Sequence, residues 1–337
     1  MLLAEALVVA SLVQACGSRP AQGEAPPSNF VYFGRDHELV SDSGFLSQPG
    51  VVGAQLTFTW RELEPERDRY DLAAIREYVE LLQSHGRRLF LQLSDVTFSE
   101  RPPVPDYLLS DPAFHGGAAR KYEGAAGVFD GLVARRWDPA VRERFARLLQ
   151  ALGREFDGVI EGVNLPETAI GFEDPAFHPE GFTFDGYAAG IRDNLRNARR
   201  SFSRSCVIIY ANFMPGETLP AVDRGYLRGI HELAARIGAG VGGPDLLPFR
   251  EGQQANSLPL IAGRSAGVVA GIAVQHGNLA ELDPATGRPV TVEALYRYAV
   301  DTLRLDYIFW GVEEPYYSRD VLPLLRSIAE PGGTRFP

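Results

Sequence analysis

The feature that most constrains how this chain folds is a series of eight short apolar runs that recur along its length. Each run is a nearly continuous stretch rich in Val, Ile and Leu, which is typical of parallel strands covered on both faces. The runs lie at residues 30–34, 53–59, 88–93, 159–163, 207–211, 238–241, 269–274 and 307–310. We therefore predict eight parallel strands.

Amphipathic helices are predicted between most of these runs. Apolar residues recur at a spacing of three to four within 72–82, 141–156, 187–195 and 226–237, as expected for helices with one buried face. Asp138 and Pro139 are well suited to begin the second of these helices, as its N-cap and first helical residue. Segments 37–49 and 248–267 lack a full helical stripe.

Strands that alternate with helices predict a single α/β domain, a (β/α)8 barrel of the TIM-barrel type, over residues 29–337. A doubly wound sheet is the alternative, and it is disfavoured because no Gly-rich phosphate-binding turn follows an early strand. The length of 337 residues and the hydrophobic fraction of 45% are sufficient for the large core that such a barrel requires.

Composition argues against several other classes of protein. The formal net charge is −10, whereas a nucleic-acid-binding protein needs a basic surface, so no nucleic-acid partner is expected. Two cysteines are too few for a disulfide scaffold or a Cys-rich zinc module. The six histidines include no pair at the helical i, i+4 spacing of a zinc site, so we expect no metal. A metal-dependent barrel hydrolase, with a cluster of His37, His276 and Asp95 across the barrel, is the alternative.

The first 16 residues are typical of a secretory signal. Residues 7–13 have the length of a signal-peptide core, and 12–16 (LVQAC) resemble a bacterial lipobox that ends in Cys16, the residue that would be lipidated. Residues 17–28 are rich in Pro, Gly and Ser and predict a flexible tether. We expect a secreted bacterial lipoprotein in the periplasm or at the cell surface, with a lipid anchor at Cys16 as its membrane contact. A simple cleaved signal peptide is the alternative.

The candidate site residues are those that follow each predicted strand, because such barrels form their active sites at the carboxyl ends of the strands. These segments supply carboxylates, side-chain amides and aromatic rings. The mixture suits sugars, whose faces stack on rings and whose hydroxyls hydrogen-bond to polar side chains. The candidates are Trp60, Asp95, Asn164, Glu167, Asn212, Asp245, Gln275, His276, Trp310, Glu313 and Glu314.

Several of these residues carry a resemblance to a known group of enzymes. Residues 60–65 (WRELEP), followed by Tyr70-Asp71, resemble the second unit of clan-A glycoside hydrolases. Asn164 and Glu167 lie where that clan keeps an Asn-Glu acid/base pair, and Trp310 lies where it often has a Trp in a sugar subsite. The resemblance implies a barrel that hydrolyses an extracytoplasmic poly- or oligosaccharide, with Glu167 as general acid/base, and a glycosidase needs no cofactor.

The chain departs from the clan's pattern where the nucleophile belongs. The clan has a Glu at the end of strand seven, whereas residues 275–278 read QHGN. Glycosidic cleavage uses two carboxyl groups, so the second would come from Glu313, Glu314 or Asp245, in a retaining or an inverting reaction. Whichever of Glu313 and Glu314 is not catalytic is expected to cap the helix near Ser318. The alternative function is a non-catalytic carbohydrate-binding lipoprotein on a glycosidase-like barrel.

The other candidates are assigned to substrate binding or to structure. Trp60 and Trp310 are expected to stack on sugar rings. Glu161 lies inside an apolar run, so it is expected to form a buried ion pair with an Arg. Segment 99–136 contains several aromatic residues and no helical pattern, and is predicted to pack as a lid over the cleft. The expected ligands of sugar hydroxyls are Asp95, Asn164, Asn212, Gln275, His276 and Glu314.

Overall fold

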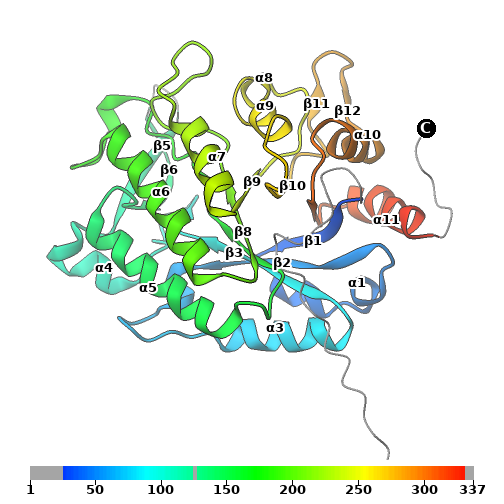
Figure 1. Cartoon of the computed structure of the whole chain (residues 1–337), viewed down its shortest axis with the longest axis horizontal. Helices are drawn as coiled ribbons and strands as arrows, with labels where there is room; N and C mark the ends of the chain where they lie inside the picture. The colour runs from blue at the N-terminus through cyan, green and yellow to red at the C-terminus, as the bar shows by residue number, and fades with distance from the viewer. Residues whose placement is uncertain (1–25, 124–126, 331–337) are drawn as a thin grey trace, which may run out of the picture.

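The computed structural model describes residues 26–123 and 127–330, and its main sheet closes into a barrel. Eight strands form the barrel in the order β1-β13-β10-β9-β8-β7-β3-β2, with helices around it (Figure 1). Every pairing in the barrel is parallel. The predicted (β/α)8 barrel is therefore confirmed. The predicted signal segment 1–16 with Cys16, and most of the tether at 17–28, lie outside the described residues.

Each predicted strand corresponds to one strand of the barrel. The fourth begins at Gly162 and not at residue 159, because residues 157–161 turn after the preceding helix before the chain enters the sheet. The barrel strands are β1 (Ser28–Gly34), β2 (Val51–Thr59), β3 (Arg88–Ser94), β7 (Gly162–Leu165), β8 (Cys206–Tyr210), β9 (Gly240–Gly243), β10 (Ala270–Val274) and β13 (Tyr307–Gly311).

The four predicted amphipathic helices are present, and α5 begins where expected because the Asp138 carboxylate accepts hydrogen bonds from the backbone N–H groups of Ala140 and Val141. The segments without a full stripe form only short helices. The longer helices are α3 (Ala73–Ser84), α5 (Pro139–Phe156), α6 (Phe184–Ser201), α7 (Tyr226–Ile237) and α11 (Leu322–Ala329). The shorter helices are α1 (Ser43–Ser47), α2 (Trp60–Leu63), α8 (Glu251–Ala255), α9 (Ser257–Ala262) and α10 (Val292–Arg297). Among the described residues, no helix is long and apolar enough to span a membrane.

The segment predicted as a lid without regular structure contains two strands and a short helix. Its strands β5 (Ala118–Glu123) and β6 (Val128–Ala134) form a small antiparallel sheet with β4 (Val96–Thr97), which precedes the segment, in the order β4-β6-β5, and the short helix α4 (Asp106–Ser110) precedes β5. Backbone hydrogen bonds in this sheet satisfy the polar groups that a long irregular loop would leave exposed. The sheet follows β3 directly, so it extends the wall of the barrel mouth.

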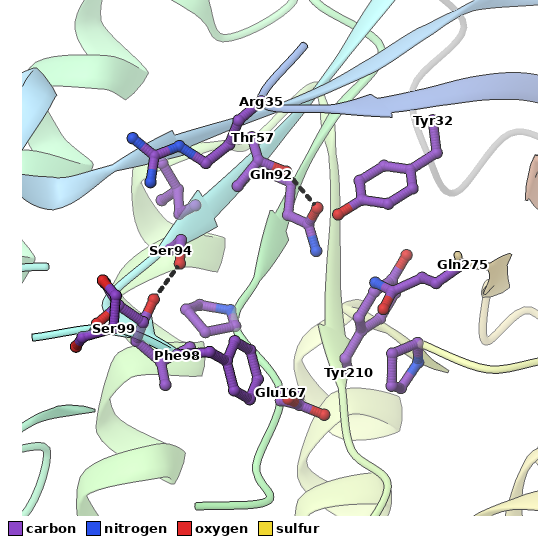
Figure 2. A pocket seen from close by; sticks show the side chains of 15 residues that line it. Tyr32, Arg35, Thr57, Gln92, Ser94, Phe98, Ser99, Glu167, Tyr210 and Gln275 are labelled. Atoms are coloured by element: carbon purple, nitrogen blue, oxygen red, sulfur yellow. Dashed lines mark hydrogen bonds between the residues drawn. The ribbon is translucent and has the colours of Figure 1, made fainter. Parts of the chain in front are cut away.

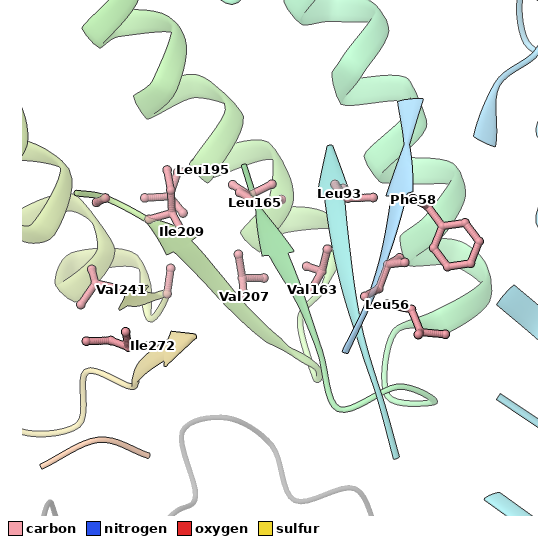
Figure 3. Packing of buried hydrophobic residues seen from close by; sticks show 14 of the residues in the cluster. Leu56, Phe58, Leu93, Val163, Leu165, Leu195, Val207, Ile209, Val241 and Ile272 are labelled. Atoms are coloured by element: carbon pink, nitrogen blue, oxygen red, sulfur yellow. The ribbon is translucent and has the colours of Figure 1, made fainter. Parts of the chain in front are cut away.

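A hydrophobic layer lies between the barrel and its helices. Outward-facing side chains of neighbouring strands pack against the apolar faces of the helices, as Figure 3 shows for Val207 and Ile209 of β8 and Leu195 of α6. All three are at most 2% exposed. The same layer includes Leu56, Leu93, Val163, Leu165, Val241 and Ile272.

A second, mostly aromatic core fills the barrel interior. Phe90 makes edge-to-face contacts with Phe30 and Phe309, at centroid distances of 5.8 and 5.0 Å. Glycine makes room for these rings, because a Cβ at Gly162 would meet the ring of Phe90. The inside of this part of the barrel is therefore filled with side chains, and a ligand can enter only at one end.

Candidate active site

A cavity of about 410 Å³ opens above the aromatic core, and residues at or beyond the carboxyl ends of the strands line it (Figure 2). This is the end at which barrels of this type bind their substrates. It is lined by Tyr32, Arg35, Thr57, Gln92, Leu93, Ser94, Val96, Thr97, Phe98, Ser99, Pro166, Glu167, Tyr210, Pro244 and Gln275. Val96 to Ser99 come from β4 and its flank, so this wall is built mainly by residues that precede the predicted lid, of which Ser99 is the first residue.

The cavity floor is made by the same faces of the strands that build the aromatic core. Side chains two residues apart on a strand share a face, so Tyr32 stands above Phe30. Likewise Tyr210 stands above Ile208, and Gln92 accepts a hydrogen bond from Thr57 at 2.7 Å. The inward face thus changes from aromatic to polar towards the mouth. The residues of this floor lie within the strands, so they are not among the candidates that follow each predicted strand. The two-residue alternation of side chains along a strand is the sequence signal that could have identified them.

Glu167 lies in the cavity wall, as predicted, on the short segment that follows β7. This segment is tied to the neighbouring strand because the backbone N–H of Thr168 donates to the carbonyl of Tyr210 at 2.9 Å. The Thr168 hydroxyl also donates to the carbonyl of Phe213 at 2.6 Å. These bonds fix the backbone that carries the Glu167 carboxyl group.

Asn212 orients the carboxyl group of Glu167. Its Nδ2 donates to Oε2 of Glu167 at 3.0 Å, while its Oδ1 accepts from the backbone N–H of Phe213 at 3.0 Å. Because Oδ1 is engaged on the backbone, the amide must present its NH2 group to Glu167. Asn212 was predicted to bind sugar hydroxyls, but it does not line the cavity. The structure assigns it to positioning Glu167.

Burial is the largest influence on Glu167 and raises the pKa of its carboxyl group above the ordinary value. The hydrogen bond from Asn212 opposes the rise, and the negative charge of Asp245 adds to it. Arg136 and Lys121 lower the pKa, and the net change is upward. A carboxyl group that keeps its proton to higher pH is suited to act as a general acid.

Beneath Glu167 lies a buried ion pair between Arg136 and Asp95. Arg136 Nε donates to Asp95 Oδ2 at 2.9 Å, and each side chain is at most 3% exposed. Nη1 of Arg136 donates to the carbonyl of Glu167 at 2.7 Å and to the hydroxyl of Tyr187 at 2.8 Å. Burial raises the pKa of Tyr187 to about 12, so its hydroxyl stays neutral and donates to the Thr168 carbonyl. Asp95 is therefore a structural partner of Arg136, and the prediction that it binds sugar hydroxyls is wrong.

Asp245 lies just beyond Pro244, which lines the cavity at the end of β9. Its Oδ1 accepts from Asn278 at 2.8 Å and its Oδ2 accepts from Arg250 at 3.0 Å. These contacts hold the Asp245 carboxylate in place at the end of β9. The negative charge of Asp245 contributes to the raised pKa of Glu167.

The acidic residues after β13 support loops. Glu313 Oε2 accepts from the backbone N–H of Gly277 at 2.8 Å, which ties the β13 loop to the β10 loop. Glu314 is exposed and accepts from the backbone N–H of Ser318, so it is the predicted helix-capping residue of the pair. Neither residue lines the cavity, and neither does the exposed His276. Their predicted roles at the substrate are therefore corrected.

The two tryptophans predicted to stack on sugars are core residues. Trp60 is 1% exposed, contacts Phe145 edge-to-face at 5.2 Å, and donates from Nε1 to Glu64. Trp310 is 0% exposed and donates from Nε1 to Asn29 Oδ1 at 2.9 Å. Trp310 points away from the interior because its neighbour Phe309 points inward, and successive strand residues face opposite sides.

Replacing Trp310 by Ala is therefore expected to destabilise the fold. The cavity left behind and the lost contacts should lower the free energy of unfolding by about 3–5 kcal/mol in urea titrations. Phe98→Ala is the matched comparison, because Phe98 is 72% exposed at the cavity wall. It should leave stability within about 0.5 kcal/mol of the parent. A stable Trp310→Ala protein would contradict the packing described.

The remaining amide candidates have different positions. Gln275 lines the cavity, as predicted. Asn164 is 0% exposed, donates to the carbonyl of Leu165 and does not line the cavity, so its predicted contact with substrate is corrected. Arg35 and Phe98 were not singled out, although both lie in segments that directly follow predicted strands. Glu161 forms the predicted ion pair, with Arg88 at 2.7 Å, at the opposite end of the barrel.

Metal ligation finds no support in the part of the chain that the structure describes. No cluster of three or more His, Cys, Asp or Glu side chains there has the arrangement of a metal site. The polar side chains of the cavity wall are mainly hydroxyls and amides, which suit hydrogen bonding to a polar ligand.

Comparison with known proteins identifies structures of the same fold but does not assign the chain to a family. No protein-family model and no curated protein sequence matches the chain. Among solved structures, the catalytic domain of a beta-amylase from Paenibacillus polymyxa is similar, with a TM-score of 0.60. The match covers 91% of this chain and 100% of that chain at 10% sequence identity. A likeness at this identity establishes the shared barrel fold.

Proposed function

We propose that the protein is a glycoside hydrolase in which Glu167 is the general acid. The observation that carries the proposal is a carboxyl group of raised pKa, held by Asn212 in the wall of a cavity at the carboxyl end of the barrel. The same cavity offers the rings of Tyr32 and Phe98 for stacking, because both are at least partly exposed. The similarity in fold to a beta-amylase catalytic domain agrees with this assignment.

Asp245 is proposed as the second carboxylate, acting as general base. It lies behind Pro244 and does not line the cavity, so a water molecule would have to bridge it to the sugar, as in an inverting reaction. Asp245 would take a proton from that water as its oxygen attacks the anomeric carbon. Glu167 would give its proton to the leaving oxygen as the glycosidic bond breaks. The product is a free sugar of inverted anomeric configuration.

Carbohydrate binding without hydrolysis is the second candidate function. The observation that favours it is that Glu167 is the single carboxyl group among the residues that line the cavity. On this alternative, the barrel would bind oligosaccharides through Gln92, Gln275 and the aromatic wall. The lipid anchor at Cys16 and the location in the periplasm or at the cell surface remain proposals from the sequence.

Hydrolysis of a broad oligosaccharide panel by the full chain tests the proposal. We expect turnover of at least one substrate, with the product released first in the inverted anomeric form, as followed by proton NMR. Asp245→Asn should lower kcat by about 100- to 10,000-fold, because it removes the general base.

The matched control is Asp301→Asn, which changes an exposed aspartate far along the chain from the cavity segments and should keep parental activity. A retained anomeric configuration would exclude Asp245 as the base of an inverting reaction. Saturable oligosaccharide binding without any turnover would exclude the hydrolase and favour the binding protein.

A further inference from the structure

Arg35 places a permanent positive charge in the cavity wall. It follows β1 immediately after Gly34, and its side chain is 52% exposed. A guanidinium group stays protonated at any physiological pH. Figure 2 shows Arg35 near Thr57 and on the opposite side of the view from Gln275, so it belongs to one end of the cavity.

Glu62 holds Arg35 by one edge of the guanidinium group. Nη2 of Arg35 lies 2.7 Å from Oε1 of Glu62. The other oxygen of Glu62 accepts from the backbone N–H and the hydroxyl of Thr59, each at 2.8 Å, in the capping box of α2. Within residues 26–123 and 127–330, Nε and Nη1 of Arg35 have no hydrogen-bond acceptor. Arg35 is thus anchored and still has N–H groups to offer a ligand.

Two hydroxyl oxygens of the cavity lining can accept a hydrogen bond from a ligand: that of Ser94, which lies on the same side of Figure 2 as Arg35, and that of Thr97. Ser94 donates its hydroxyl proton to the carbonyl of Val96 at 2.9 Å, so its oxygen can take a hydrogen bond from a ligand. The Thr97 hydroxyl donates to the carbonyl of Ser99 at 3.1 Å, which leaves its oxygen with the same capacity. This end therefore combines one cationic donor with neutral acceptors.

We propose that this end of the cavity binds an acidic sugar residue, whose carboxylate or sulfate group pairs with the free N–H groups of Arg35. The hydroxyl groups of such a sugar residue would donate hydrogen bonds to the oxygens of Ser94 and Thr97. A guanidinium group binds an anionic oxygen pair more strongly than a neutral hydroxyl, because the hydrogen bonds are charge-assisted and can be bidentate. The inference rests on the proposed function for its carbohydrate class and narrows the substrates to anionic glycans.

Calorimetric titration of the full chain with matched charged and neutral sugars tests this assignment. The probes are oligogalacturonates, glucuronate-containing oligosaccharides and sulfated galacto-oligosaccharides, each beside its methyl-esterified or unsulfated counterpart. We expect one acidic series to bind at least about 10-fold more tightly than its neutral counterpart, with the preference weakening at high salt. Whether the uronates or the sulfated sugars bind identifies the acid group.

Arg35→Gln should reduce affinity for the acidic sugar by about 10- to 100-fold and leave neutral sugars unchanged. Arg35→Lys keeps the positive charge but loses the planar guanidinium group, so its affinity for the acidic sugar should lie between those of the parent and of Arg35→Gln. Arg67→Gln is the matched control, because Arg67 is 55% exposed, pairs with Asp111 and does not line the cavity. Equal affinity for acidic and neutral sugars, or an Arg35→Gln protein that keeps the preference, would overturn the proposal.

Glu167→Gln separates this inference from the proposed hydrolysis. It should keep the Arg35-dependent preference for acidic sugars, since it leaves Arg35 and Glu62 in place. Binding of this kind without turnover by the parent would overturn the hydrolase and support the acidic-sugar site. Turnover of neutral glycans alone would support the hydrolase and overturn the site.

Discussion

Glu167→Gln is expected to lower kcat on an ordinary glycosidic linkage by about 100- to 10,000-fold, because the leaving oxygen loses its proton donor. Aryl glycosides with a strongly acidic phenol as leaving group need little protonation, so their hydrolysis should fall far less. A difference between the two substrate types would identify Glu167 as the general acid. An equal loss on both would contradict that role.

Two further variants accompany Glu167→Gln, one as a control and one that changes the pKa of Glu167. Glu77→Gln changes an exposed carboxylate on α3 and should keep parental kinetics. Asn212→Ala removes the hydrogen bond that stabilises the charged Glu167, so it should raise the pKa of that group further.

The pH dependence of activity follows from the direction of the Glu167 pKa. A general acid acts in its protonated form, so activity should be lost as the pH rises through the pKa of Glu167 in the folded protein. Because burial raises that pKa, the alkaline limb should lie above the ordinary range of a glutamate. In Asn212→Ala the limb should move to still higher pH. A limb that stays in place in this variant would argue against control by Glu167.

Arg136→Met is expected to lower the free energy of unfolding by about 3–5 kcal/mol, as measured in urea, because it leaves the buried Asp95 without its partner. It also removes the donor to the Glu167 carbonyl, so activity should fall together with stability. The double variant Asp95→Leu, Arg136→Met should recover part of the stability, since it leaves no unpaired buried charge.

Arg76→Met is the matched control for Arg136. Arg76 pairs with Glu155 on the surface, with its side chain 53% exposed, and an ion pair that is exposed to solvent contributes little to stability. If Arg136→Met were no more destabilising than Arg76→Met, the buried pair would not be the anchor that the structure indicates.

Local sequence patterns were sufficient to predict the architecture. Apolar runs mark every barrel strand, because parallel strands covered on both faces must be apolar along most of their length. Local rules also located the start of α5 at Asp138 and the position of Glu167 just beyond β7. The ion pair of Glu161 followed from the cost of burying an unpaired charge. Each of these features depends on residues that are close together in the sequence, or on the burial of a single residue.

Which of the strand-end residues reach a ligand depends on contacts that form in the closed barrel. Trp310 lies one residue before the end of β13, close to the predicted end of the strand, but the alternation of side chains along that strand turns its ring into the helix layer. Asp95 and Asn212 were expected at the substrate, yet their partners Arg136 and Glu167 lie 41 and 45 residues away in the sequence. Hydrogen bonds between such distant residues exist only once the barrel has closed and brought the strand ends together. For that reason the sequence indicated the chemistry available at the mouth of the barrel, and the closed fold determined which groups face the cavity and which hold them in place.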